Sequence, residues 1–301
     1  MIYTIRHVTT YRYESAVGIS RCVMRLTPAT TPWQRVLEHQ ILLTPKPSET
    51  DWRRGPFGAA TLTALIDTPH ETLVIDARAK VDLDAPIIDS WDDSPPWETV
   101  RQLSFNSPGL GEDSPAPYLY PTARTPLTSE ITEYARVSFP PGRPIISAVV
   151  DLMQRMHADF TFDPKSTDVD TPPAKAFAGR RGVCQDFAHV MICGLRGLGL
   201  PAAYMSGYLR TTPPPGRPRL AGADAMHAWV SVWCGLERDW VSVDPTNALI
   251  VRNDHIVLAR GRDYADVAPI DGVLLGTGEQ ELKTEVDVIP EGEPAAATTA
   301  R

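Results

Sequence analysis

The chain has 301 residues, of which 43% are hydrophobic, 22% charged and 8% aromatic, which excludes a disordered chain, a coiled coil and a disulfide-stapled miniprotein. With 29 basic and 37 acidic residues the net charge is −8, so nucleic acid is not an expected partner. No basic stretch followed by an apolar one opens the chain, and its apolar runs are too short to span a bilayer. We therefore expect a cytoplasmic protein without a membrane partner.

Residues 1–85 are predicted to form an antiparallel β domain, as a sandwich or a barrel. The clearest strand is at 73–83, where every second residue is apolar and charged residues lie between them. Shorter strand candidates, separated by Pro and Gly turns, lie at 2–13, 22–26, 40–44 and 61–66.

Residues 86–142 are short amphipathic pieces broken by prolines, and we interpret them as a connecting region with small helices. Residues 143–290 are predicted to form a core domain. It begins with a helix in which Pro144 takes the first position and an apolar stripe runs from Ile145 to Met156.

A second helix is predicted from Cys184 to about Gly197, where Gly197 or Gly199 ends it. Beyond Leu200 the core continues as strands, interrupted by a Pro-rich loop at 211–219. Residues 291–301 are predicted to be a disordered tail.

Cys184 is the candidate nucleophile among four cysteines, none of which has CxxC spacing. It lies at the predicted first turn of a helix, where free backbone N–H groups and the helix dipole favour the thiolate. Cys193, nine residues later in the same helix, is typical of a buried and inert cysteine.

His227 and Asp244 lie on two strand-like runs joined by a predicted hairpin. A two-residue loop at Gly235-Leu236 would pair Cys234 with Glu237 and set His227 directly opposite Asp244. A four-residue loop would place the two side chains diagonally but still on one face, whereas an odd loop length would separate them.

A cysteine, a histidine that deprotonates it and a carboxylate that orients the imidazole form the general pattern of a catalytic triad. Two alternatives remain open: a purely structural His227–Asp244 pair, or zinc bound by Cys184, His227 and Asp244. The sequence lacks the HExxH-like spacing typical of zinc hydrolases, so we predict no metal site. It also has no nucleotide-binding loop, and we predict no cofactor.

These residues resemble the successive motifs of the transglutaminase-like cysteine enzymes, and the first eighty residues resemble the N-terminal domain of bacterial members. His227 follows Cys184 by 43 residues and Asp244 follows His227 by 17, in the order of the family. The motifs that carry the resemblance are Gly182-Val183-Cys184-Gln185-Asp186-Phe187-Ala188, Gly199-Leu200-Pro201-Ala202, Gly207-Tyr208, His227-Ala228-Trp229, Asp244-Pro245-Thr246 and the segment 259–267.

The resemblance implies an α+β protein in which an N-terminal β-sandwich precedes a papain-like core, with the cysteine helix packed on an antiparallel sheet. It implies Cys184 as nucleophile, His227 as general base and then acid, and Asp244 as the orienting carboxylate. Gln185, Tyr208 and Trp229 are the candidate substrate-binding residues. The chain departs from many relatives at Ser231 and Met226, outside the triad, so substrate specificity is not carried over.

The predicted function is a thiol acyl enzyme that cleaves or transfers amide bonds in a peptide or protein through a thioester. Hydrolysis is slightly favoured over the alternative, a protein-glutamine transamidase. A non-catalytic protein-binding module that retains the fold is the competing class, and a homo-oligomer is left open.

Overall fold

The computed structural model describes residues 1–301 except 89, 108, 212–221, 223 and 294–301. Nearly all of the predicted Pro-rich loop and most of the predicted tail therefore lie outside the described residues. Among the described helices, none combines the length and the apolar character needed to cross a bilayer.

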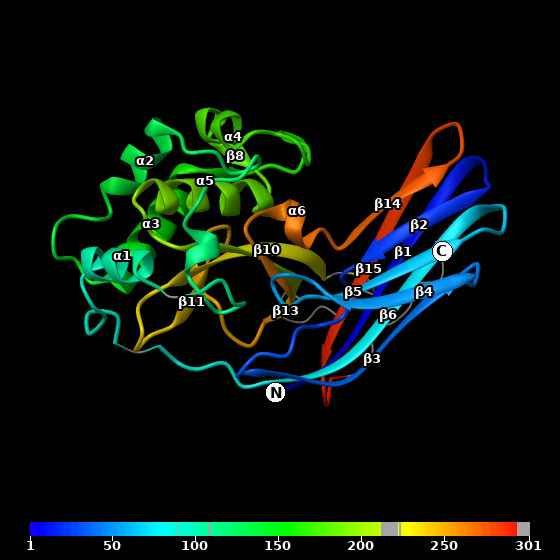
Figure 1. Cartoon of the computed structure of the whole chain (residues 1–301), viewed down its shortest axis with the longest axis horizontal. Helices are drawn as coiled ribbons and strands as arrows, with labels where there is room; N and C mark the ends of the chain where they lie inside the picture. Colours follow the sequence, from blue (N-terminus) through cyan, green and yellow to red (C-terminus); the bar gives the residue numbers. More distant parts are fainter. Residues whose placement is uncertain (89, 108, 212–221, 223, 294–301) are drawn as a thin grey trace.

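One half of the molecule is a β-sandwich of two antiparallel four-stranded sheets, which confirms the predicted N-terminal β-sandwich (Figure 1). Side chains from both sheets share one apolar core, with Met24 and Ile66 from one sheet and Ile75 from the other. The first sheet has the order β15-β1-β6-β3 and the second β14-β2-β5-β4. The strands are β1 (Ile2–Val17), β2 (Ile19–Met24), β3 (Gln34–Thr44), β4 (Glu49–Arg54), β5 (Ala60–Ile66), β6 (His70–Leu83), β14 (Ile270–Leu275) and β15 (Gln280–Pro290).

Burial along β6 follows the predicted alternation, because its apolar side chains face the core while the residues between them are more exposed. The sequence analysis did not identify β4. All six residues of that strand are exposed, so it lacks the period-two apolar pattern that reveals a half-buried strand.

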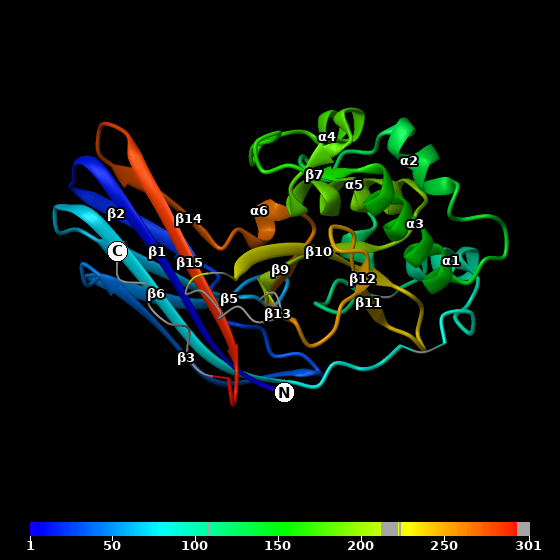
Figure 2. The same cartoon turned by 180° about the vertical axis from the view of Figure 1, so that it is seen from behind.

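The C-terminal strands belong to the sandwich, although the sequence analysis grouped them with the catalytic core. β15 pairs with β1 along its whole length and β14 pairs with β2, so each sheet of the sandwich has one C-terminal strand at its edge. The reason is packing: Val286 and Val288 of β15 are buried against Tyr3 and Ile5 of β1. Figure 2 shows β15 lying beside β1 across the back of the sandwich.

The other half is a five-stranded antiparallel sheet of order β12-β11-β10-β9-β13, with helices over one face (Figures 1 and 2). Its strands are β9 (Ala202–Leu209), β10 (Ala225–Trp233), β11 (Trp240–Asp244), β12 (Leu249–Ile250) and β13 (His255–Gly261). The remaining elements are α1 (Trp97–Phe105), η1 (Ala116–Tyr118), α2 (Ser129–Arg136), α3 (Ile145–Asp159), β7 (Thr161–Phe162), α4 (Pro173–Gly179), β8 (Arg181–Gly182), α5 (Cys184–Gly197) and α6 (Tyr264–Val267).

The predicted connecting region does contain small helices, but these helices are part of the core. Val100 of α1 and Ile131 of α2 are buried in the same apolar cluster as α3, α5 and the sheet. The helix predicted after Gly142 is α3, which begins at Ile145, because Pro144 is extended and precedes the first turn.

Candidate active site

Cys184 is the first residue of α5, as predicted, and it is partly exposed. The carboxylate of Asp186 holds this helix start, because its Oδ2 accepts hydrogen bonds from the Val183 backbone N–H (2.8 Å) and the Thr167 hydroxyl (2.6 Å). A Cβ on Gly182 would lie 2.5 Å from the same Oδ2, so a glycine leaves the space that the capping carboxylate occupies. The sulfur is therefore placed by a locally encoded helix N-terminus.

The β10–β11 hairpin brings His227 and Asp244 to one face through the four-residue alternative, and the predicted two-residue turn is wrong. Trp233 pairs with Trp240 and Val230 with Val243, and the Cys234 N–H bonds to the Asp239 carbonyl across the loop. The pairing register is thus shifted by two residues from the one that the two-residue turn predicts. Because side chains alternate with a period of two, the shift leaves both residues on the same face.

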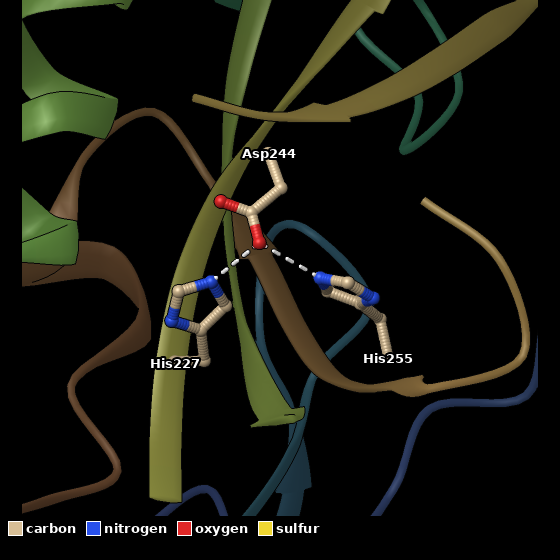
Figure 3. A group of neighbouring side chains, drawn as sticks. All are labelled: His227, Asp244 and His255. Carbon is tan, nitrogen blue, oxygen red and sulfur yellow. Dashed lines mark hydrogen bonds and ion pairs between the residues drawn. The ribbon is translucent and has the colours of Figure 1, made fainter. Parts of the chain in front are cut away.

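The imidazole of His227 contacts the carboxylate of Asp244 directly (Figure 3). The Nε2–H of His227 donates to Asp244 Oδ2 at 2.7 Å, which is a charge-assisted hydrogen bond. The other ring nitrogen, Nδ1, takes no part in this bond. Asp244 is completely buried and His227 is 8% exposed. Water therefore competes little for this contact.

Asp244 is surrounded by hydrogen-bond donors. Its Oδ1 accepts the backbone N–H groups of Thr246 and Asn247, and its Oδ2 also accepts the Asn247 amide at 2.7 Å and His255 Nε2–H at 3.0 Å. Burial alone would raise the pKa of Asp244, but the bonds from His227, His255 and Asn247 hold this pKa well below its ordinary value. The carboxylate is ionised at neutral pH.

The electrostatics of His227 are set by its two acidic neighbours. Burial alone would lower its pKa, but interactions with Asp244 and the Cys184 thiol outweigh burial and raise the pKa from 6.5 to about 10. The Cys184 side chain thus interacts with the same imidazole that Asp244 holds. These interactions favour the protonated form of the His227 ring.

His227, Asp244 and His255 each bring one potential metal-binding atom within 4.8 Å of the others. Tetrahedral zinc with bonds of about 2.0–2.2 Å holds its ligand atoms roughly 3.3 Å apart. The two imidazole nitrogens instead lie 2.7 and 3.0 Å from one Asp244 oxygen, which are hydrogen-bond distances. His227, Asp244 and His255 therefore fit a hydrogen-bonded network better than a zinc site.

The three candidate substrate-binding residues have different surroundings. Gln185 is partly exposed beside Cys184, and its amide donates to the Val169 carbonyl at 3.0 Å. Tyr208 and Trp229 are buried, which contradicts a direct role in substrate contact. Long apolar strands pack such aromatic rings inside the protein, and one sequence does not reveal which face of a strand is covered.

Tyr208 lies between the two halves of the molecule, where its hydroxyl bonds to His7 Nδ1 at 3.1 Å. Trp229 supports the site from within: its ring is nearly parallel to that of His227, with centroids 6.2 Å apart. Gly207 of β9 makes room for it, because a Cβ there would lie 2.6 Å from the Trp229 ring and overlap the Ile256 carbonyl oxygen.

The sequence analysis missed His255 and Asn247. Asn247 lies three residues after Asp244 in an Asp-Pro-Thr-Asn turn, and this local signal could have identified it. His255 begins a buried strand and shows no local signal, because only the order of strands in the sheet brings β13 near Asp244.

Two family models match the chain. The model described as "Transglutaminase-like superfamily" matches residues 135–245, which contain Cys184, His227 and Asp244. The model described as "Bacterial transglutaminase-like N-terminal region" matches residues 3–82, the greater part of the sandwich.

Similar proteins occur in bacteria. An uncharacterized protein of Mycobacterium tuberculosis is 37% identical over 295 residues, which are 96% of this chain and 92% of the relative. A protein-glutamine gamma-glutamyltransferase of Pseudomonas aeruginosa is 35% identical over 102 residues, which are 33% of this chain but only 15% of that protein.

A solved structure shares the fold. It is the crystal structure of a "putative cysteine protease" from Cytophaga hutchinsonii, which is 20% identical and superimposes with a TM-score of 0.72 over 100% of this chain and 94% of that chain. Because the family models cover both halves and the mycobacterial relative extends along nearly the entire sequence, the chain belongs to the transglutaminase-like superfamily.

Proposed function

We propose that the protein is a thiol acyl enzyme that acts on amide bonds of a peptide or protein, with Cys184 as nucleophile, His227 as acid and base, and Asp244 as the orienting carboxylate. The observation that supports this most is the 2.7 Å contact between His227 and Asp244, together with the interaction of the same imidazole with Cys184, the first residue of α5. The His227 pKa of about 10 adds to it, because a protonated imidazole favours the thiolate of a neighbouring cysteine.

In the proposed reaction the Cys184 thiolate attacks the amide carbonyl, and backbone N–H groups at the start of α5 stabilise the negative oxygen. The carbon–nitrogen bond then breaks, and the His227 imidazolium donates its proton to the departing amine or ammonia. A thioester and a neutral imidazole remain. His227 next takes a proton from water, whose oxygen attacks the thioester and releases the acid and the Cys184 sulfur.

We favour water over an amine as the acceptor. The short match to the glutamyltransferase of Pseudomonas aeruginosa is the observation that favours the second candidate, transfer to an amine. A glutamine-containing peptide supplied with a fluorescent primary amine separates the two activities: hydrolysis predicts ammonia release without incorporation of the amine. Incorporation that depends on Cys184 would contradict hydrolysis and support the transamidase.

The triad is tested without knowledge of the substrate by alkylation with dilute iodoacetamide at pH 6, followed by mass spectrometry. We expect Cys184 to react at least about tenfold faster in the wild type than in His227→Ala, because the imidazolium is lost. Burial raises the pKa of the three other cysteines, that of Cys193 to about 12, so they should react slowly in both proteins.

Cys22→Ala in the sandwich is the matched control and should leave the reaction at Cys184 unchanged. Equal rates at Cys184 in the wild type and His227→Ala would refute the triad and favour a non-catalytic binding module.

A further inference from the structure

Asp244 receives a second buried histidine from the strand at the far edge of the sheet. His255 is the first residue of β13 and is 1% exposed, and its Nε2–H donates to the same Asp244 oxygen that His227 contacts (Figure 3). The two imidazoles approach this oxygen from different strands, with ring centroids 5.8 Å apart.

The polar contact, rather than packing, accounts for a histidine at this position. Nδ1 of His255 is buried without a hydrogen-bond partner among the described residues, which is a cost that an apolar side chain would avoid. Within the described part of the chain, the side-chain hydrogen bond that can offset this cost is the one from His255 Nε2–H to Asp244. Because Nε2 faces a carboxylate, it carries the proton.

The position of the His255 ring is fixed on two sides. The indole of Trp229 meets it edge to face, with centroids 5.1 Å apart and an angle of 78°. Two residues further along β13, both backbone groups of Val257 bond at 2.8 Å to the side chain of Gln34, which is buried in the N-terminal half. The donor is therefore aimed at Asp244 before any substrate binds.

We propose that His255 is a positioning residue that stabilises the ionised, correctly oriented carboxylate of Asp244 and so supports the ion pair of His227 and Cys184. This inference rests on the proposed triad. The groups that face Asp244 are His227 from β10, His255 from β13 and Asn247 from the turn after β11. Because the Asn247 amide does not titrate, loss of His255 would leave His227 as the ionisable side chain that donates to Asp244.

The consequence is a shift of the acid limit of Cys184 reactivity, which is the pH below which Cys184 stops reacting with the alkylating reagent. A hydrogen bond to the charged form of a group shifts the ionisation of that group by about one to two pH units. Without His255 the Asp244 carboxylate should accept a proton at higher pH, and the neutral acid no longer stabilises the His227 imidazolium. The reactive form of Cys184 would then disappear at higher pH.

The experiment measures the rate of Cys184 alkylation against pH in the full-length wild type, His255→Phe, His255→Gln and His227→Ala. We expect His255→Phe to move the acid limit upward by about one unit. His255→Gln places an amide N–H near the former Nε2 and should restore much of the wild-type profile. Urea unfolding of each variant confirms that it is folded.

His70→Phe is the matched control, because His70 is also buried and hydrogen-bonded but lies in the sandwich. It should lower stability without moving the acid limit. An unchanged limit in folded His255→Phe would overturn the proposal, as would an equal shift in His70→Phe. Equal profiles of the wild type and His227→Ala would instead reject the triad, so the two failures are distinguishable.

Discussion

At the residue scale, the Asp244 carboxylate joins local and distant contacts. The backbone groups of Thr246 and Asn247 lie within three residues of it, whereas His227 comes from the neighbouring strand and His255 from the sheet edge. The local backbone N–H groups bond to Oδ1, whereas the two distant histidines and the Asn247 side-chain amide bond to Oδ2. The same carboxylate can therefore remain ionised in a buried site and hold a protonated imidazole.

The raised pKa of His227 predicts a pH dependence of stability. Because the folded-state pKa is about 10 and the ordinary value is 6.5, the stabilisation is fully present below about pH 6.5 and is lost as the pH rises through about 10. We expect the free energy of unfolding of the wild type to fall relative to that of His227→Gln across this range. Urea titrations at several pH values measure the difference, and a difference that stays constant would contradict the prediction.

At the element scale, the first turn of α5 depends on Asp186. This side chain is 3% exposed, and burial raises its pKa although the bonds from Thr167 and Val183 act in the opposite direction. Those bonds satisfy a backbone donor that a helix start would otherwise leave free. The position of the Cys184 sulfur therefore depends on the carboxylate two residues after it.

Asp186→Ala should lower the free energy of unfolding by about 1–3 kcal/mol, because the Val183 N–H and the Thr167 hydroxyl lose their acceptor. Asp186→Asn retains one acceptor oxygen and should lose less. Thermal or urea unfolding measures both changes. Asp67→Ala, at an exposed position, is the control and should stay within about 0.5 kcal/mol. If Asp186→Ala is as stable as this control, the side chain does not cap the helix.

At the scale of the whole molecule, the N-terminal half covers the edge of the core sheet. β13 is the last strand in that sheet, and the Gln34 side chain and the Ala29 backbone N–H bond to the backbone of Val257 where another strand would pair. Tyr208, Ile256 and Leu258 of the core share an apolar cluster with strands of the sandwich. The sandwich thus supports the strand that carries His255.

Gln34→Ala should destabilise the protein by roughly 1–3 kcal/mol, because the buried Val257 N–H is left without its acceptor. Gln40→Ala is a matched control on the same strand, at an exposed position. Urea unfolding compares the two variants with the wild type. Equal stabilities of the two variants would show that the Gln34 contact does not hold the halves together.

Features that depend on near neighbours could be predicted from the order of the amino acids. The alternating burial of β6 and the apolar stripe of α3 repeat every few residues, so both patterns are visible in the sequence. The start of α5 at Cys184 is likewise fixed by residues close to it in the sequence. The shared face of His227 and Asp244 was also predictable, because any even loop length preserves it.

Which distant segments meet became known from the folded molecule. It set the four-residue hairpin loop, returned β14 and β15 to the sandwich and buried Tyr208 and Trp229. It also brought His255 to Asp244. The physical reason is that strand order and the covering of each face depend on packing between segments far apart in sequence, which leaves no local period to detect.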